Sequence, residues 1–260
     1  MKKQLFIIGS IILLGISILS PVIANASTDN YLVKKNKLVI GMEGSYAPFG
    51  YRNKKGKLTG FEVEIAKLLA KKLNLKPEFK LTKFDSLTIG LNSHNFDIVL
   101  NNMGYSKERG QEFLFSKTYL YSRTVAIHTK KVKINSLKDI KNKKMAQSTA
   151  SNYGQMAIKA GGKIVSVTGF AEELNLIASG RADGSINDLG AFSIWKKENK
   201  NNLLVATDLK DVKAEGVYAL INKKEIKLQQ KIDDTLMTLK KDGTLKKLSI
   251  KYFGMDLTEQ

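Results

Sequence analysis

Short apolar runs alternate with longer segments of helical periodicity in the first part of the chain. Residues 38–41 and 96–100 are apolar enough to form buried strands, and residues 77–81 are predicted to form another strand. Residues 61–73 carry their apolar side chains at helical spacing. A second helix is predicted over residues 84–93. The order strand, helix, strand, helix, strand predicts right-handed crossovers and a mostly parallel sheet.

The same alternation recurs after residue 122, which predicts a second α/β lobe. Its predicted strands cover residues 123–128, 144–147, 163–167 and 182–187, and its predicted helices cover a short segment capped by Ser136, residues 153–160, residues 171–179 and the segment that follows Asp188 through Lys197. A strand over residues 217–221 and helices over 225–240 and 245–252 are expected to return to the first lobe. The chain would then cross between the lobes near residues 122–125 and 211–215, and two such crossings make a hinge.

The first residues are predicted to lie outside this fold. Lys2 and Lys3 precede an apolar run that ends in Ala24-Asn25-Ala26, which is the pattern of a secretory signal peptide cleaved before Ser27. An uncleaved membrane anchor is the alternative, because the run is nearly long enough to span a bilayer. The A-x-A ending favours cleavage. The predicted organisation is a signal peptide over 1–26, a mobile polar leader over 27–37, lobe 1 over 38–123 and 215–260, and lobe 2 over 124–214.

Charge and cysteine content narrow the classes of partner. Removing residues 1–26 takes away two lysines and no acidic residue, which lowers the net charge from +19 to +17. An exported protein this basic is expected to adhere to anionic cell-wall polymer or to an anionic membrane surface. Nucleic acid is disfavoured, because the protein is exported and carries no nucleic-acid motif. The chain contains no cysteine, which excludes disulfides, thiolate chemistry and a lipid anchor on cysteine.

The strongest candidate chemistry follows the predicted strand over residues 96–100. The chain there becomes small and polar over residues 101–109 and ends in Arg109, one of only four arginines among 43 basic residues. A guanidinium is a planar fork that fits both oxygens of a carboxylate, and backbone amides around Asn102 and Gly104 would add donors. The alternative is a solvated arginine at a strand-to-loop junction. Motif matches alone do not decide between the two.

Two further signals fall at the same edge of the predicted sheet. Ligands of such sheets bind beyond the carboxyl ends of the strands. The loop over residues 42–49 follows the first strand and contains Tyr46 and Phe49, while Phe84 begins the second predicted helix. These aromatic side chains would form a wall for a ligand, or they would simply pack beneath the loop. The convergence of three signals on one edge favours a binding site.

The second lobe offers two polar positions of its own. Residues 148–152 form a small polar loop before a predicted helix, so its amides would bind an anion or merely cap the helix. Asp188 ends a predicted strand and begins a helix, so it would serve as a site carboxylate, as a helix cap, or as both.

These motifs, taken together and in order, resemble the extracellular solute-binding proteins of ABC importers for polar amino acids. The matching segments are GMEGSYAPF over residues 41–49, LTGFEVEIA over 58–66, FDSL over 84–87, FDIV over 96–99, the stretch over 101–109, SGRAD over 179–183, DGTL over 242–245 and KYFG over 251–254. The segment over residues 146–154, together with Asn187 and Asp188, is most similar to the cystine-binding branch. The resemblance implies a two-lobed periplasmic-binding-protein fold of two mixed, mostly parallel sheets joined by two hinge strands.

The resemblance also implies a role for each matching residue. Arg109 would bind the ligand α-carboxylate with amides near Asn102 and Gly104, and Asp188 would bind the α-ammonium. The remaining implied contacts are the flanking rings of Tyr46 and Phe84, the amides around Ala150 and Ser151, and the acidic side chain of Glu43 facing the site. Gly104 and Ala150 depart from the hydroxyl residues frequent in the family, so only their backbone would serve.

The implied function is capture of an amino acid, with L-cystine favoured, and its delivery to a membrane permease. Glutamine, histidine or arginine is the alternative ligand, and a basic surface adhesin is the alternative function. A lyase with Glu43 as general acid is a further alternative, because fold alone does not exclude it. His94 and His128 lie far apart in the chain, and no pair has metal-ligand spacing. We therefore expect no catalytic residue, no metal and no cofactor in a secreted, cell-surface protein for which a monomer suffices.

Overall fold

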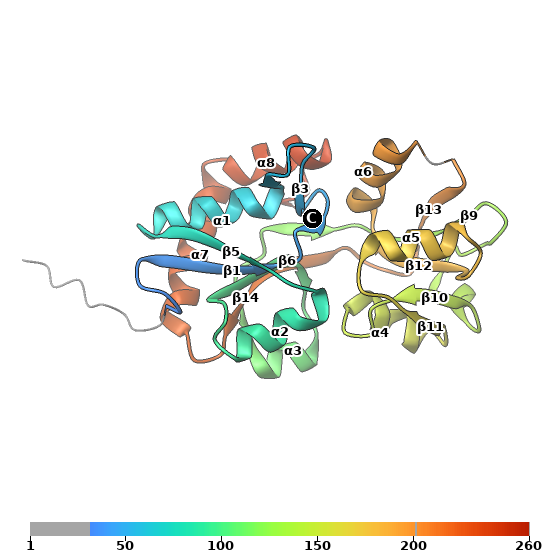
Figure 1. Ribbon diagram of the computed structural model, residues 1–260, viewed down its shortest axis with the longest axis horizontal. Helices are drawn as coiled ribbons and strands as arrows, with labels where there is room; N and C mark the ends of the chain where they lie inside the picture. Colours follow the sequence, from blue (N-terminus) through green and yellow to red (C-terminus); the bar gives the residue numbers. More distant parts are fainter. Residues whose placement is uncertain (1–31, 201, 260) are drawn as a thin grey trace, which may run out of the picture. The chain divides into compact units, whose positions relative to one another are not determined.

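The computed structural model describes residues 32–200 and 202–259, which form two mixed β-sheets, each covered by helices (Figure 1). The strands of the first sheet are, in spatial order, β5 (Lys76–Leu81), β1 (Lys37–Met42), β6 (Ile98–Gly104), β14 (Glu215–Asn222) and β7 (Phe113–Phe115), with β8 (Leu120–Ser122) also paired to β14. β1 runs parallel to β5 and β6, whereas β14 is antiparallel to its neighbours. We refer to this sheet and its helices as lobe 1.

Helices cover both faces of the first sheet. They are α1 (Phe61–Lys72), α2 (Phe84–Asn92), α3 (Lys107–Glu112), α7 (Ile226–Lys241) and α8 (Thr244–Phe253), with α1 and α8 on one side and α2 and α3 on the other (Figure 1). Successive strand side chains point to opposite faces. Leu38 and Ile40 of β1 accordingly enter the core beneath α1, α7 and α8, while Val39 enters the core beneath α2.

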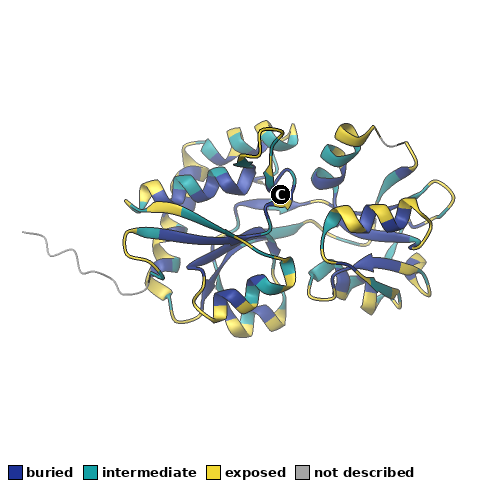
Figure 2. Cartoon of the chain, in the orientation of Figure 1, coloured by how far each residue is buried: buried dark blue, intermediate teal, exposed yellow. Residues whose placement is uncertain are grey.

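The second sheet has the same layered construction. Its strands are β11 (Lys163–Ser166), β10 (Lys144–Gln147), β12 (Gly184–Asp188), β9 (Thr124–Thr129) and β13 (Leu204–Asp208), and its helices are η1 (Leu137–Ile140), α4 (Asn152–Lys159), α5 (Phe170–Ala178) and α6 (Leu189–Asn199). β9 sends Val125 and Ile127 to one core and Ala126 to the other. The inner strands of both sheets are largely buried, whereas the edge strands β5, β11 and β13 are more exposed (Figure 2). We refer to this sheet and its helices as lobe 2.

The predicted α/β class with two mixed sheets is confirmed. The chain leaves the first sheet after Ser122 and enters the second at Thr124, and it returns between β13 and β14. At this junction Arg123 pairs with Asp208, with Nη2 and Oδ2 2.7 Å apart. Both side chains are about half exposed, so this ion pair contributes little to stability. The exact lobe boundaries stay predictions.

Three features of the fold differ from the sequence-based expectation or were not expected. The strand expected to end at residue 100 continues to Gly104, because β14 pairs with it as far as Val217 opposite Gly104. A register shift in β14 and a positive φ of 50° at Asn102 interrupt this pairing. The edge strand β13 and the short helix α3 had no predicted counterpart. The loop over residues 42–49 contains β2 (Ser45–Tyr46), which forms a small sheet with β3 (Gly50–Arg52) and β4 (Leu58–Thr59).

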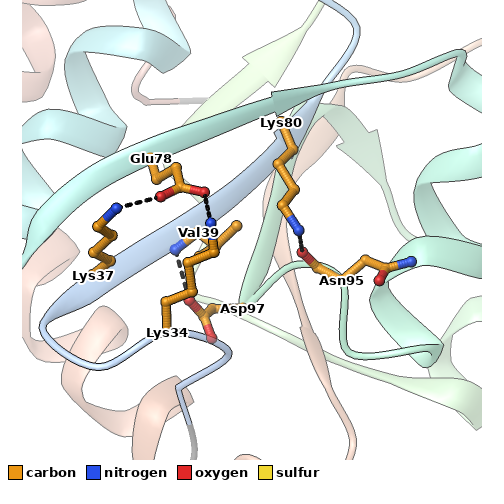
Figure 3. A network of polar contacts seen from close by, with 7 residues as sticks. All are labelled: Lys34, Lys37, Val39, Glu78, Lys80, Asn95 and Asp97. Atoms are coloured by element: carbon orange, nitrogen blue, oxygen red, sulfur yellow. Dashed lines mark hydrogen bonds and ion pairs between the residues drawn. The ribbon is translucent and has the colours of Figure 1, made fainter.

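The predicted signal peptide lies outside the described residues, whereas the end of the predicted leader lies against lobe 1. The amide of Val33 donates to Asp97 Oδ1 at 2.7 Å, and the amide of Val39 donates to Asp97 Oδ2 at 2.6 Å. Lys34 and Lys37 both contact Glu78 of β5 (Figure 3). Asp97 therefore connects the segment around Val33 and the start of β1 to the start of β6.

Candidate functional site

A pocket lies between the two lobes, and its wall comes from both. The lining residues are Glu43, Tyr46, Phe84, Asn101, Asn102, Gly104, Arg109, Ser122, Glu215, Gly216 and Val217 of lobe 1, and Gln147, Ser148, Ser151, Asn152, Tyr153, Thr168, Gly169, Phe170, Glu173 and Asn187 of lobe 2. The space between these atoms is about 720 Å³, including solvent at the mouth.

Arg109 is held at the base of the pocket by local and interlobe contacts. Ser106 caps α3 by accepting a hydrogen bond from the Arg109 amide at 3.2 Å, which sets the start of the helix. Nη1 of Arg109 donates to Gly104 O at 3.0 Å and to Asn152 Oδ1 at 2.9 Å, and Nη2 donates to Ala150 O at 2.9 Å. Gly104 belongs to lobe 1, whereas Ala150 and Asn152 belong to lobe 2, so the guanidinium bridges the lobes.

The guanidinium retains unused donors. Of its five N–H groups, three are accounted for, and Nε–H and the second Nη2–H meet no acceptor within residues 32–200 and 202–259. Arg109 is only 9% exposed and has no ion pair with a described carboxylate, and burial lowers its pKa from the ordinary value. A buried cation without a counterion is costly. The open Nε–Nη2 edge is therefore a ready partner for an anionic group.

Direct contacts hold the two lobes together around the pocket. The hydroxyl of Tyr46 donates to Asn187 Oδ1 at 2.6 Å, and Asn152 Nδ2 donates to Tyr105 O at 2.9 Å. Ser148 Oγ donates to Asp85 Oδ1 at 2.5 Å. The rings of Tyr46 and Phe170 also meet edge to face, with centroids 5.6 Å apart. These contacts describe a closed arrangement of the lobes.

Carboxyl groups gather on and behind one wall of the pocket. Burial raises the pKa of Glu173 to about 8 and that of Glu62, which lies behind the lining, to about 7. Glu62 Oε1 accepts hydrogen bonds from Tyr119 and from the amide of Asn102. Burial also raises the pKa of Glu43, although a hydrogen bond from Asn101 opposes this effect. This wall is consequently acidic.

Asp188 caps the helix α6, which was one of the two roles predicted for it. Its Oδ1 accepts a hydrogen bond from the amide of Ala191, and it is the N-cap of α6. Its Oδ2 accepts a hydrogen bond from Ser122 Oγ at 2.6 Å, and the same Ser122 Oγ lies 2.8 Å from the hydroxyl of Tyr153. Burial raises the pKa of Asp188. The carboxylate thus lies one hydrogen bond away from Ser122, which lines the pocket.

The structure brings most of the predicted site residues together. Those that line the pocket are Glu43, Tyr46, Phe84, Asn102, Gly104, Arg109 and Ser151. Ala150 and Asp188 are not among the lining residues, although each contacts one that is. Ser151 accepts a hydrogen bond from the amide of Gly154 and caps α4. The ligand contacts assigned to these residues stay predictions.

Several lining residues have no counterpart in the sequence-based prediction. Among them are Phe170, Glu173 and Glu215. Glu173 lies on the same face of its helix as Phe170 and Ile177, so an acidic residue on a buried stripe was the available signal. Glu215 lies where the chain returns to lobe 1, and no local pattern marks it. Phe49, by contrast, is fully buried and packs on Tyr46 with centroids 5.0 Å apart.

Residues 32–200 and 202–259 contain neither a candidate metal site nor a candidate membrane-spanning helix. No group of three or more His, Cys, Asp or Glu side chains there is placed to hold a metal ion. No helix there has the length and apolar character needed to cross a membrane.

Two α/β lobes that meet over a polar pocket, with a buried unpaired arginine in it, define a two-lobed solute-binding protein. The sequence profile of the bacterial extracellular solute-binding proteins, family 3, matches residues 38–255. The chain belongs to this family. This result confirms the family inferred from the motifs.

Two relatives illustrate the family membership. A Haemophilus influenzae protein named as a probable amino-acid ABC transporter-binding protein is 41% identical over 230 residues, which are 87% of this chain and 89% of that protein. The L-cystine-binding protein TcyA of Bacillus subtilis is 39% identical over 230 residues, which are 87% of this chain and 84% of that protein.

Two solved structures bear on the arrangement of the lobes. The L-cystine solute receptor of Neisseria gonorrhoeae, in an unliganded open conformation, is 40% identical and has a TM-score of 0.58, with 86% of this chain and 95% of that chain covered. An ancestral arginine-binding protein bound to arginine is 32% identical and has a TM-score of 0.78, with 85% and 99% covered. The structure with the lower sequence identity is the more similar in shape, which agrees with the interlobe contacts of a closed form.

Proposed function

We propose that this protein is the solute-binding component of an amino-acid ABC importer, and that it captures L-cystine outside the membrane and delivers it to a permease. The observation that carries the proposal is the buried guanidinium of Arg109, which lines the pocket and keeps two N–H donors without an acceptor among the described residues. The relatives named as cystine-binding and amino-acid ABC transporter-binding proteins support the ligand and the partner. In this proposal the site binds its ligand without converting it.

The α-carboxylate of the ligand binds to Arg109. Two parallel N–H donors match the two carboxylate oxygens, and a charge-assisted bidentate pair is stronger than a bond to a neutral carbonyl. The α-ammonium is assigned to Asp188, whose negative charge reaches the pocket through Ser122. Tyr46 and Phe84 border the ligand, and Phe84 lies under Arg109 with 5.9 Å between Cζ and the ring centroid.

Ligand binding favours the closed form because the two charges lie on different lobes. Arg109 belongs to lobe 1, whereas Asp188 ends β12 of lobe 2. A zwitterionic amino acid therefore lies between the two charges only when the lobes meet, and it shifts the population toward closure. The hydrogen bond between Tyr46 and Asn187 and that between Ser148 and Asp85 form in the same step. The permease would then recognise the closed shape.

Isothermal titration of residues 27–260, freed of bound ligand, tests the proposal. We expect one-to-one binding of L-cystine, tighter than that of glutamine, histidine or arginine. Arg109→Ala should weaken binding by about 3 kcal/mol, roughly 150-fold, because the buried carboxylate loses its partner. Arg123→Ala is the matched control, since Arg123 is exposed and does not line the pocket.

Three outcomes would count against parts of this proposal. A preference for another amino acid would keep the importer function and discard cystine. Unchanged affinity in Arg109→Ala would refute the role of the guanidinium. No binding of any amino acid in the panel would refute the function itself.

A further inference from the structure

The pocket lining is rich in carboxyl groups although the chain is basic. The chain carries a net charge of +19, yet the described lining contains the carboxyl groups of Glu43, Glu173 and Glu215 and the single cation Arg109. A ligand with one carboxylate and one ammonium pairs with one cation and one carboxyl group. The lining therefore contains more carboxyl groups than a simple zwitterion uses.

Glu173 of α5 presents one oxygen without a partner. It is only 6% exposed, and its Oε2 accepts hydrogen bonds from Ser185 Oγ at 2.7 Å and from Asn187 Nδ2 at 2.8 Å. Its Oε1 accepts none from the described residues, although the residue lines the pocket. Burying a carboxyl is expensive, and leaving one oxygen unbonded adds to the cost. This geometry is suited to an incoming donor.

A second free carboxyl oxygen belongs to the same wall. Glu43 Oε2 accepts a hydrogen bond from Asn101 Nδ2 at 2.7 Å, while Glu43 Oε1 has no donor among the described residues. Tyr46 donates to Asn187 of the other lobe, and Asn187 donates to Glu173. Glu43 and Glu173 both line the pocket, and the charge of Glu43 contributes to the raised pKa of Glu173.

We infer that Glu173 and Glu43, one from each lobe, form a subsite for a second ammonium group of the ligand. An ammonium group carries three N–H donors and no acceptor, so it can donate to the unpaired oxygens of both carboxylates. This inference rests on the proposed function, because Arg109 must hold the first carboxylate. It identifies the ligand class as amino acids with a second amino group, of which cystine is one.

Proton exchange accompanies binding at such a subsite. Burial, together with the charge of Glu43, holds the pKa of Glu173 at about 8, so its carboxyl carries a proton at pH 7 when the pocket is empty. The charge of Asp85 contributes to the raised pKa of Glu43, and the charge of Glu43 contributes to the raised pKa of Glu62. An ammonium group next to Glu173 favours the carboxylate. The proton then leaves to solvent as the ligand binds.

A matched pair of ligands tests the subsite. L-Cystine and the mixed disulfide of L-cysteine with 3-mercaptopropionate differ only by one amino group. By titration calorimetry we expect the natural protein to bind cystine at least tenfold more tightly. Glu173→Gln should reduce that preference to less than threefold, because glutamine offers no negative charge to the second ammonium group. Glu172→Gln, the exposed neighbour outside this pocket, should behave like the natural protein.

Titration in two buffers of different ionisation enthalpy provides a second measurement. Near pH 7, cystine should release close to one proton from the natural protein and close to none from Glu173→Gln. Equal affinity of the natural protein for both ligands, or equal weakening of both by Glu173→Gln, would overturn the subsite and leave the proposed function intact. Binding of neither ligand to the natural protein would refute the proposed function.

Discussion

Adding a single carbon atom at Gly104 should weaken ligand binding without lowering the stability of the fold. A Cβ at Gly104 would lie 2.7 Å from Asn152 Nδ2 and 3.1 Å from Glu215 Oε2. Asn152 has little freedom to retreat, because it donates to Tyr105 O and accepts from Arg109 Nη1. Overpacking of this kind costs about 1–3 kcal/mol. Since Asn152 belongs to lobe 2, the cost falls on the closed form.

Gly104→Ala should therefore weaken cystine binding by roughly 5- to 150-fold, measured by titration calorimetry. The open protein should unfold at an unchanged or slightly higher urea concentration, because alanine reduces the entropy of the unfolded chain. Gly169→Ala is the matched control. Gly169 also lines the pocket, but an added Cβ would meet only Glu43 Oε1 at 3.9 Å. Affinities within twofold for both variants would show that Gly104 and Asn152 do not approach each other in the bound state.

Two further predictions concern stability. The pKa values of Glu62 and Glu173, raised to about 7 and about 8, mean that the folded state keeps protons that the unfolded state loses above pH 4.5. The free energy of unfolding should therefore fall as pH rises from about 5 to 8, by on the order of 3 kcal/mol for each group. Urea denaturation at several pH values measures this dependence, which should be smaller in Glu62→Gln. An unfolding free energy that does not change with pH, or a pH dependence that is the same in Glu62→Gln, would contradict this reasoning. Asp97→Asn should lower the free energy of unfolding by about 1–3 kcal/mol, because an amide has only one oxygen for the amides of Val33 and Val39. Glu78→Gln, whose ion pairs with Lys34 and Lys37 are solvent-exposed, should change it little, and equal losses in the two variants would refute the distinction.

The hydrophobic pattern predicted the fold best for strands that are buried on both faces and for helices with one periodic apolar face. β1 lies inside its sheet, and its apolar run could be recognised without any tertiary information. β13 is an edge strand of mostly intermediate burial, and its apolar run over residues 204–206 is only three residues long. The end of β6 was missed for a different reason. Asn101 and Asn102 have a polar, loop-like composition, and the strand continues past them because Met103 and Gly104 pair with Tyr218 and Val217 of the distant β14.

The site could be predicted from strand ends in lobe 1 and much less in lobe 2. Arg109, Tyr46 and Phe84 follow strands whose carboxyl ends meet at one edge, and position in the fold is enough to group them. Glu173 and Phe170 enter the pocket from a helix, and Glu215 enters it from the chain crossing. The position of these side chains in the pocket depends on how the two lobes meet, and no short segment of the sequence contains that information.

The buried carboxyls that lower stability at neutral pH belong to the surroundings of the binding site. Glu62 supports the strained backbone of Asn102 by accepting a hydrogen bond from its amide, and the buried Oδ1 of Asn102 has no partner among the described residues. Glu173 holds Asn187, which receives the hydroxyl of Tyr46 across the cleft. Strain and unpaired polar groups persist where the surrounding structure enforces them, and they cluster at functional sites. An ammonium group on this wall would satisfy the free oxygens and restore the negative charge of Glu173. The ligand would thus relieve a cost that the empty closed form bears alone, and this difference would drive the lobes to close around it.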